Sequence, residues 1–332
     1  MDNYQGETGM VLRRSFKDMA KDLYCRLGIP GSLLRLAGLS RRPRLFIFTY
    51  HRVCDASGSA SYLAVPSSVF ESHMRFIKNN FKIVSLLEGV EILSKDTSGG
   101  MYAAITFDDG YMDNYLNAFP ILKKHNVPAT IFLTTDFIGK DSLFWWDRIF
   151  NVVSQFQLNG KTREEMADDI NSTLLRKKES EIESLVSGLE ARHLNNKDIR
   201  PCAMLGWDEA REMRDNGLID FGSHTKTHQN LCLLNDTEAL EELRGSKKKI
   251  EQELDIEVNV FCYPYGLFDK RVKDLISQAG FKCARSASQG SNSRETDRFS
   301  LNYIGVGSLL RTDFLAARVS SNLFKTRNGV TA

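Results

Sequence analysis

Short apolar runs alternate with amphipathic stretches along most of this chain, and that alternation limits the folds that it can adopt. The apolar runs cover residues 45–50, 81–84, 102–107, 129–133, 258–261 and 281–284. Runs of this length predict buried strands, and the apolar residues that recur three and four positions apart between most of them predict helices. Repeated strand–helix units build a parallel sheet with crossover helices, so we predict an α/β fold.

One stretch, residues 141–201, breaks this alternation. It opens with Phe144-Trp145-Trp146-Asp147 and continues as mostly polar helical sequence without a strand pattern. We interpret it as a helical insertion after the fourth strand. Long insertions at the functional face of a fold often form lids or binding walls.

Two adjacent carboxylates, Asp108 and Asp109, stand directly after the strand predicted at 102–107. Like charges repel, and burial penalises each ionised carboxylate unless a cation or a proton compensates for it. A metal ion bound to one carboxylate would compensate, and it would leave the other carboxylate free to act as a base. The alternative is a strand-end carboxylate that accepts hydrogen bonds from the N–H groups of the next loop.

Two histidines four residues apart, His224 and His228, follow the strand-like residues 218–221. A spacing of four places both imidazoles on one side of a helical turn, where they can share an ion. Two His and one Asp with an open coordination position form the ligand set of a hydrolytic metal site, for which zinc is the first expectation and cobalt, nickel or manganese the others. Taken alone, such a pair is more often an ordinary surface pair.

These polar motifs all follow predicted strands. In a closed parallel barrel the carboxyl ends of the strands meet at one mouth, where active sites are built. If the sheet closes, the two carboxylates and the two imidazoles therefore converge.

Four segments also carry a family resemblance. Thr106-Phe107-Asp108-Asp109-Gly110 and His224-x-x-x-His228 resemble the first two motifs of the polysaccharide deacetylase family, carbohydrate esterase family 4. Tyr263-Pro264-Tyr265-Gly266 is similar to the third motif, and Tyr50-His51-Arg52-Val53 resembles the opening of the permuted branch that includes poly-N-acetylglucosamine deacetylases of exopolysaccharide systems. The similarity runs over residues 45–306 and implies an irregular (β/α)7 barrel of the type called the NodB homology domain.

The resemblance implies a role for each polar residue of these motifs. Asp109, His224 and His228 are the expected metal ligands, and Asp108 is the expected general base that takes a proton from the attacking water. Many relatives carry the catalytic acid as a late histidine, but no histidine follows His228 here. In the permuted branch the acid is the early histidine, which implies His51, because imidazole titrates in the right range. The alternative for His51 is a structural histidine at the barrel rim.

The third motif is expected to shape the floor of the site. By resemblance, the backbone N–H of Tyr265 helps to hold the oxyanion, and Tyr263 and Pro264 are further expected substrate contacts. The alternative is a turn that Pro and Gly force, and both roles are compatible. Trp146, like its neighbour Trp145, could stack on a sugar ring or could anchor the insertion on the barrel, since large aromatic side chains are usually buried.

One position departs from the family. The commoner pattern has an arginine two positions before the proline of the third motif, where it orients the base, but Cys262 stands there. The orienting cation must come from elsewhere, with Arg52 and Arg285 as the candidates, or it is missing.

Bulk composition narrows the partners and the compartment. The net charge is only +2, so the chain lacks the strong positive electrostatic field that is typical of nucleic-acid-binding proteins. The 42% of hydrophobic residues is enough to form a folded core. Six cysteines without a C-x-x-C pair favour reduced thiols. No apolar run approaches the roughly 20 residues of a membrane span, and the first residues show no secretory signal. We therefore expect a cytoplasmic protein.

Residues 10–44 are strongly basic, and apolar residues recur in them at helical spacing from Leu12 to Leu27. Such a helix can make peripheral contact with the inner membrane face, or it can pack across the base of the domain. We accordingly divide the chain into a basic helical segment, residues 1–43, and a barrel domain, residues 44–332, that includes the insertion.

The resemblance implies a metal-dependent hydrolase that removes the N-acetyl group from an amino sugar in a polysaccharide or its glycan precursor. One alternative is a deacylase or deformylase of a lipid-linked amino sugar, which pocket volume would distinguish. The other is a catalytically inactive, carbohydrate-binding member of the fold. The intact motif residues argue against an inactive protein. The only feature that favours inactivity is Cys262, which stands where the commoner family pattern has arginine.

Overall fold

The structure is a computed structural model, and it describes residues 42–55, 63–95, 99–141, 143–156, 162–194, 203–307 and 312–322. Nearly all of the predicted basic segment, residues 1–43, lies outside the described residues. No helix of the described part is long and apolar enough to cross a bilayer.

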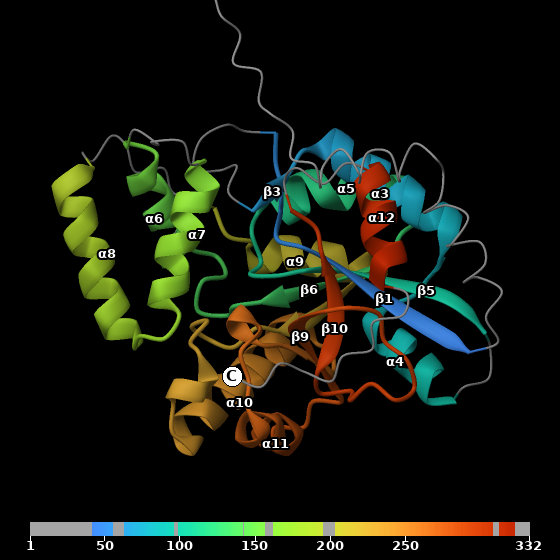
Figure 1. Cartoon of the computed structure of the whole chain (residues 1–332). Coiled ribbons are helices and arrows are strands. Elements are labelled where there is room, and N and C mark those ends of the chain that lie inside the picture. The colour runs from blue at the N-terminus through green and yellow to red at the C-terminus, as the bar shows by residue number, and fades with distance from the viewer. Residues whose placement is uncertain are drawn as a thin grey trace, which may run out of the picture.

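The described strands close into a barrel of seven parallel strands (Figure 1). In chain order they are β1 (Pro43–Tyr50), β5 (Gly100–Phe107), β6 (Ala129–Leu133), β7 (Ile219–Ser223), β8 (Val260–Cys262), β9 (Cys283–Gln289) and β10 (Leu301–Gly305). Closure comes from β1, which pairs with β5 on one side and with β10 on the other. The eighth strand of the sheet, β4 (Lys82–Ile83), pairs only with β5. The predicted (β/α)7 barrel is confirmed.

Alternation along the strands separates an inner from an outer face. One apolar cluster fills the interior of the barrel, and it includes Leu45, Ile47, Tyr102 and Ala104. Most of the seven barrel strands contribute side chains to this cluster. Their neighbours in the sequence belong to a second cluster, shared with the surrounding helices. Because side chains alternate with a period of two, the inner face of β5 continues from Tyr102 and Ala104 to Asp108, at the carboxyl end of the strand.

Helices cover the outside of the barrel. They are α3 (Ser67–Asn80), α5 (Phe119–His125), α9 (Trp207–Asp215), α10 (Asp236–Leu254), α11 (Lys270–Gln278) and α12 (Thr312–Asn322). The helix α4 (Leu86–Lys95) packs against β1 and β5, and Gly89 of α4 lies so close to Leu45 that a Cβ there would be 2.7 Å from the Leu45 side chain. Shorter elements are the strands β2 (Arg52–Val53) and β3 (Ala64–Val65), the π-helix η2 (Asn114–Ala118), and the 3₁₀-helices η3 (Leu231–Leu233) and η4 (Pro264–Gly266).

The predicted helical insertion is present between β6, the fourth strand of the eight-stranded sheet, and β7. It contains α6 (Trp145–Val153), α7 (Arg163–Leu174) and α8 (Glu179–His193), which stand together beside one end of the barrel (Figure 1). A β-bridge between Asp141 and Ala203 joins the two ends of the segment. The three helices share an apolar cluster of their own, and Arg148 of α6 binds two carboxylates of α8.

Candidate active site

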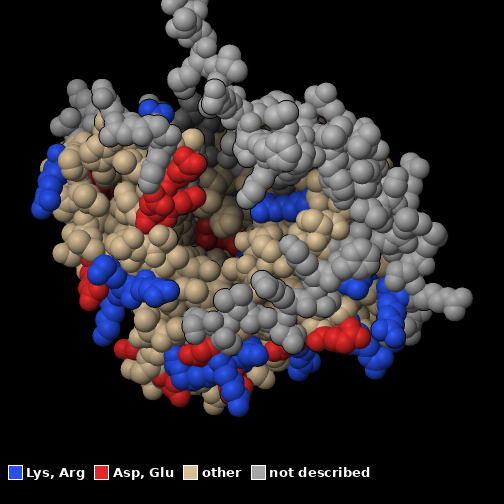
Figure 2. All heavy atoms as spheres, in the orientation of Figure 1, with Lys and Arg blue, Asp and Glu red and all other residues tan. Residues whose placement is uncertain are grey.

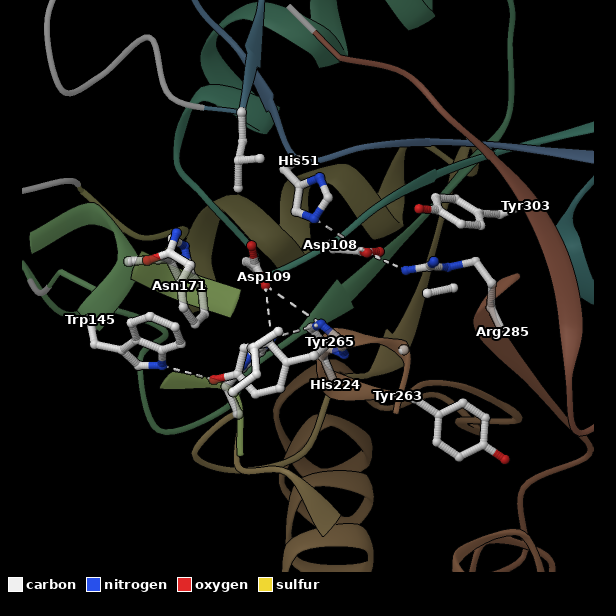
Figure 3. Close-up of a pocket in the computed structure, with 16 residues that line it drawn as sticks. His51, Asp108, Asp109, Trp145, Asn171, His224, Tyr263, Tyr265, Arg285 and Tyr303 are labelled. Atoms are coloured by element: carbon white, nitrogen blue, oxygen red, sulfur yellow. Dashed lines mark hydrogen bonds and ion pairs between the residues drawn. The ribbon is translucent and has the colours of Figure 1, made fainter. Parts of the chain in front are cut away.

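A pocket of about 260 Å³ opens at the carboxyl ends of the barrel strands. Its lining brings together the residues predicted from the motifs and others from the insertion and from β9 and β10 (Figure 3). They are His51, Leu63, Asp108, Asp109, Trp145, Trp146, Asn171, Leu175, His224, His228, Tyr263, Tyr265, Gly266, Arg285, Ala287 and Tyr303. In the space-filling view this face is hollowed at its centre, and acidic atoms are visible inside the hollow (Figure 2).

Three buried side chains in this pocket have the geometry of a metal site. Asp109 Oδ1 lies 3.5 Å from His224 Nε2 and 3.4 Å from His228 Nε2, and the two Nε2 atoms are 3.1 Å apart. Tetrahedral zinc with bonds of about 2.0–2.2 Å separates neighbouring ligand atoms by about 3.3–3.6 Å, so one ion fits among these three atoms. The three residues are only 2–5% exposed. Their two imidazole nitrogens and one carboxylate oxygen form a donor set suited to zinc.

The electrostatics of this cluster favour a bound cation. Burial, followed by the charges of Asp108 and Asp147, raises the pKa of Asp109 well above its usual value. Burial also lowers the pKa of His224 to about 4 and lowers that of His228 well below its usual value, so both imidazoles are neutral at pH 7. Neutral imidazole is the form that binds metal, and a cation would offset the cost of ionising Asp109.

The protein fixes which nitrogen of His224 faces the cluster. Its Nδ1 lies 2.8 Å from the carbonyl oxygen of Cys262, to which only a protonated Nδ1 can donate a hydrogen bond. That tautomer leaves Nε2 unprotonated toward Asp109 and His228. Such a backbone partner is the usual way in which proteins orient a metal-binding histidine.

The backbone around the site is held in an unusual conformation. Asp109, Thr225, His228 and Tyr265 all have positive φ angles, between 58° and 75°. Residues other than glycine adopt this left-handed region at a cost of about 1–3 kcal/mol each, and such strain gathers at functional sites. Gly266 also has a positive φ of 68°, and a Cβ there would lie 2.0 Å from Cβ of Ala287. Only glycine fits at the end of the third motif.

The second carboxylate, Asp108, is bound by an arginine from a neighbouring strand. Arg285 Nη2 donates to Asp108 Oδ2, and both side chains are buried. Burial opposes ionisation of Asp108, but Arg285 and then His51 and His224 outweigh it, so the pKa of Asp108 lies below its usual value. Asp108 Oδ1 has no hydrogen-bond partner among the described residues. The carboxylate is therefore ionised, and its buried Oδ1 makes no hydrogen bond within the described residues.

His51 lies at the rim, on the other side of Asp108. Its Nε2 is 3.7 Å from Asp108 Oδ2, and its side chain is 32% exposed, so it can reach both solvent and substrate. The pKa of His51 lies below its usual value, because burial and the nearby Arg285 lower it more than Asp108 raises it. Asn114 donates a hydrogen bond from Nδ2 to the carbonyl oxygen of His51 at 2.9 Å, which fixes the backbone under the imidazole.

A family model described as polysaccharide deacetylase matches residues 95–284, more than half of the chain. The chain belongs to the polysaccharide deacetylase family. A poly-β-1,6-N-acetyl-D-glucosamine N-deacetylase of Staphylococcus aureus (strain MRSA252) is 24% identical to this chain in an alignment 254 residues long, and the alignment covers 70% of this chain and 68% of the relative. Polysaccharide deacetylases are hydrolases of carbon–nitrogen bonds other than peptide bonds, and this chain is such an enzyme.

Two solved structures share the fold. The Streptococcus pyogenes deacetylase PplD in complex with acetate aligns with 84% of this chain and 99% of its own, with a TM-score of 0.60 and 18% identity. IcaB from Ammonifex degensii aligns with 84% of this chain and 97% of its own, with a TM-score of 0.55 and 19% identity. These neighbours agree with the closed barrel.

In this deacetylase, the position of the arginine that binds Asp108 follows from strand pairing. Cys262 on β8 and Arg285 on β9 are register partners on adjacent parallel strands. The arginine that binds Asp108 therefore lies on the strand next to the one where the commoner family pattern has arginine, at the position that pairs with residue 262. Of the two candidates from the sequence, Arg52 is engaged elsewhere, because its Nε donates to Asp113 Oδ2 at 2.8 Å.

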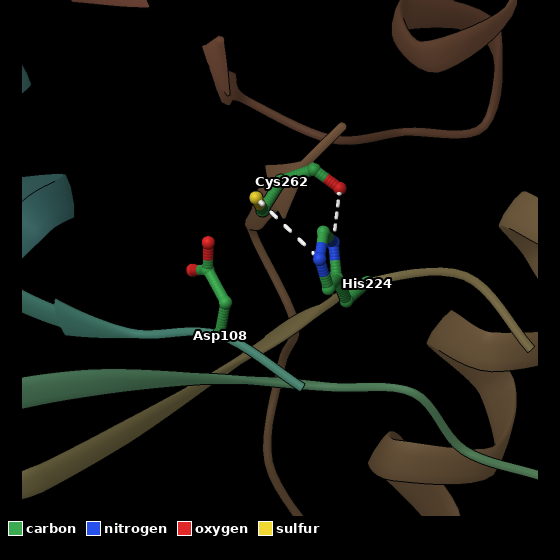
Figure 4. A group of neighbouring side chains, drawn as sticks. All are labelled: Asp108, His224 and Cys262. Atoms are coloured by element: carbon green, nitrogen blue, oxygen red, sulfur yellow. Dashed lines mark hydrogen bonds between the residues drawn. The ribbon is translucent and has the colours of Figure 1, made fainter. Parts of the chain in front are cut away.

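A second cluster of ligand-type side chains lies beside the first. Asp108, His224 and Cys262 also bring one donor atom each within 4.8 Å of one another (Figure 4). Arg285 Nη2 donates to Cys262 Sγ at 2.7 Å, so a guanidinium already occupies this space and would repel a cation. Burial raises the pKa of the Cys262 thiol well above its usual value, which keeps it neutral. The cluster of Asp109, His224 and His228 is the better candidate for a metal site.

The aromatic side chains predicted to contact substrate are partly structural. Trp145 Nε1 donates to Tyr265 Oη at 2.9 Å, and Trp146 Nε1 donates to Tyr111 Oη at 3.0 Å. Both indoles are only 6% exposed, so they anchor the insertion on the barrel, yet both line the pocket. Tyr263 reaches away from the centre, where its hydroxyl donates to the carbonyl oxygen of Phe299.

Sequence reasoning did not single out Asn171, Leu175, Ala287 or Tyr303, which also line the pocket. Asn171 and Leu175 come from the polar insertion, where no periodic signal marks a binding residue. Pro264 of the third motif is buried at the start of η4 and is absent from the described lining of the pocket.

Proposed function

We propose that this enzyme is a metal-dependent hydrolase that removes the N-acetyl group from an amino sugar in a polysaccharide or its glycan precursor. The observation that carries the proposal is the close packing of three metal-ligand atoms beside an ionised carboxylate and a rim histidine. The name of the Staphylococcus aureus relative, an N-deacetylase of a β-linked N-acetylglucosamine polymer, supports the substrate class.

Asp109, His224 and His228 would hold one divalent ion, with zinc the first expectation. The ion, when bound, supplies a Lewis acid that polarises the acetyl carbonyl and makes water a better nucleophile. The three residues fit this task because the imidazoles are neutral and one ring is oriented by the Cys262 carbonyl oxygen.

Asp108 acts as the general base in this proposal. It takes a proton from the attacking water at Oδ1, the oxygen that has no protein partner among the described residues. Arg285 holds the other oxygen and keeps the carboxylate ionised, so the base is ready at neutral pH. A base of this kind contributes about 10²–10⁴ to the rate.

His51 acts as the general acid that protonates the departing amine. Its Nε2 lies 3.7 Å from Asp108 Oδ2, so acid and base face the same small volume. Tyr265 would contribute its backbone N–H to the developing oxyanion, and Trp146 would border the sugar from the insertion side.

The pocket volume favours a small acyl group. A volume of about 260 Å³ lies below the range of about 300–1,000 Å³ usual for drug-sized ligands, so one sugar with an acetyl or formyl group fits better than a long acyl chain. The inactive alternative loses its one argument, because Arg285 supplies the cation that is absent at Cys262.

The test compares metal-free and zinc-loaded protein in two assays, hydrolysis of nitrophenyl acetate and release of acetate from N-acetylglucosamine oligomers. We expect activity in both assays only with metal, and one zinc per chain by elemental analysis. His228→Ala should lose both zinc and activity, whereas His193→Ala, which removes an exposed histidine at the end of α8, should lose neither. Undiminished activity after exhaustive chelation would refute the metal-dependent mechanism.

A further inference from the structure

The two histidines of the candidate metal site lie on a loop, and not on the helical turn that their spacing predicts. The loop follows β7, and within it Thr225 and His228 have positive φ angles of 68° and 64°. Helical residues have φ near −63°, so the spacing of four does not by itself bring the imidazoles together. Residues other than glycine keep this left-handed conformation only where their surroundings impose it. The loop therefore needs a partner that holds it in place.

Glu242 of α10 accepts three hydrogen bonds from the middle of this loop. Its Oε2 accepts from the backbone N–H of Lys226 at 2.9 Å and from that of Thr227 at 3.0 Å. Its Oε1 accepts from the Thr227 hydroxyl at 2.9 Å. Lys226 and Thr227 stand between the two histidines, so one side chain holds the segment that separates the metal ligands.

The position of Glu242 is itself fixed by the fold. The residue is only 7% exposed, and α10 packs against β7, the strand that leads into the loop. One turn further along α10, Ser246 Oγ lies 2.7 Å from Oγ of Ser223, at the end of β7. Both oxygens of Glu242 act as acceptors, which suits a carboxylate, and hydrogen bonds to an ionised acceptor are stronger than those between neutral groups.

Of the two imidazoles, that of His228 depends more on the loop. His224 is oriented by the carbonyl oxygen of Cys262, whereas His228 Nδ1 has no hydrogen-bond partner among the described residues. The N–H of His228 donates to the Thr225 hydroxyl at 2.9 Å, so the backbone at His228 is tied to the loop itself. Movement of the loop would therefore shift His228 Nε2 away from Asp109 Oδ1, which lies 3.4 Å from it.

We propose that Glu242 is a positioning residue for the metal site. By holding the two residues between His224 and His228, it sets the separation of their Nε2 atoms and thereby the affinity for the metal. The inference rests on the proposed function. Glu242 is not among the described residues that line the catalytic pocket, so it acts through the loop and not on the substrate.

The test measures the zinc Kd of the metal-free protein by competition with a chromophoric chelator. Glu242→Leu, which leaves the loop N–H groups without their acceptor, should weaken zinc binding by about 10–100-fold, the usual effect of losing a group that orients metal ligands. Glu242→Gln should keep most of the affinity, because its amide oxygen can accept from both N–H groups while its NH2 donates to the Thr227 hydroxyl.

The matched control is Glu241→Leu. Glu241 is the exposed neighbour of Glu242 on α10, and it pairs with the ammonium of Lys226 at 2.9 Å but holds no backbone group of the loop. Its loss should leave the zinc Kd unchanged. The visible spectrum of cobalt-loaded protein gives a second readout, because it reports the coordination geometry, and it should change in Glu242→Leu but not in Glu241→Leu.

These readouts separate positioning from a merely structural role. A structural glutamate would lower the melting temperature of the metal-free protein without changing the zinc Kd or the cobalt spectrum, and that result for Glu242→Leu would overturn the proposal. If Glu242→Leu does not fold, Glu242→Asp replaces it, since its carboxylate lies one methylene farther from the loop. Weakened zinc binding in Glu242→Asp would support the proposal, and an unchanged Kd would overturn it.

The same titration distinguishes this inference from the proposed function. Wild-type protein that binds no zinc would refute the proposed metal-dependent mechanism. Wild-type protein that binds one zinc, with an equal Kd in Glu242→Leu, refutes the positioning role of Glu242 alone.

Discussion

Moving the buried cation from β9 to β8 is a direct test of whether Arg285 keeps Asp108, the proposed base, ionised. Arg285→Ala removes the guanidinium that donates to Asp108 Oδ2, and Cys262→Arg supplies a guanidinium from the register partner on the adjacent strand. The double variant should therefore recover activity that Arg285→Ala loses. Removing the arginine side chain also empties the space that the new side chain at position 262 needs.

The magnitude follows from the burial of the pair, because both side chains are at most 6% exposed. Opposite charges about 4 Å apart attract by about 4 kcal/mol at an effective dielectric constant of 20, and an adjacent arginine lowers the pKa of an aspartate by about 1–3 units. Arg285→Ala should accordingly raise the pKa of Asp108 by about 1–3 units. Leaving a buried charge unpaired should also reduce the free energy of unfolding by about 3–5 kcal/mol.

The assay is the pH dependence of kcat on a zinc-loaded enzyme. In the proposed mechanism Asp108 acts as the carboxylate, so we expect activity to fall as the pH drops through its pKa. Because loss of Arg285 raises that pKa, the acidic limb should move to higher pH by about 1–3 units, with kcat at its optimum reduced by up to about 10²–10⁴ as the base loses its orientation. Cys262→Arg in the Arg285→Ala background should return the limb toward the wild-type position.

The matched control is Arg298→Ala, which removes an exposed arginine in the turn before β10. It should change neither the acidic limb nor kcat. The reasoning is wrong if Arg285→Ala retains the wild-type acidic limb and kcat. It is also wrong if the double variant folds and binds zinc but its limb stays where Arg285→Ala puts it.

Three further predictions address other parts of the chain. His51→Ala should slow acetamide hydrolysis by about 10²–10⁴ but an ester with a good leaving group much less, because that group departs without protonation; equal slowing of both substrates would exclude His51 as the acid. Deleting residues 1–40, which lie outside the described residues, should weaken flotation with anionic liposomes while zinc binding persists, and equal flotation would leave packing on the barrel as the role of that segment. Gly266→Ala should lower the melting temperature, because its φ is +68° and a Cβ would meet Ala287 at 2.0 Å, whereas Gly188→Ala in α8, with no atom within 4 Å of its Cβ, should leave it unchanged or raise it.

The sequence predicted the barrel and the meeting of the candidate metal ligands because both depend on local pattern. Apolar runs separated by helical periodicity specify parallel strands, and Asp108, Asp109, His224 and His228 each stand just beyond such a run. Once the sheet closes, strand ends must meet, so their convergence needed no knowledge of side-chain packing. Strand β10 was missed because Asn302 interrupts its apolar pattern. In the structure Asn302 is buried, and its N–H donates to Asn292 Oδ1 at 2.8 Å.

Only the tertiary structure decided which cation serves Asp108. Arg52 and Arg285 looked equivalent in the sequence, and the choice depended on the register of β8 and β9, which aligns Arg285 with Cys262 across 23 residues of chain. The helical insertion could not be placed from the sequence either, because no pattern in α7 or in its connection to α8 indicates which residues line the pocket. Hydrophobic periodicity records which face of an element is buried, but it does not record which element lies opposite, and that is fixed by strand register and helix packing alone.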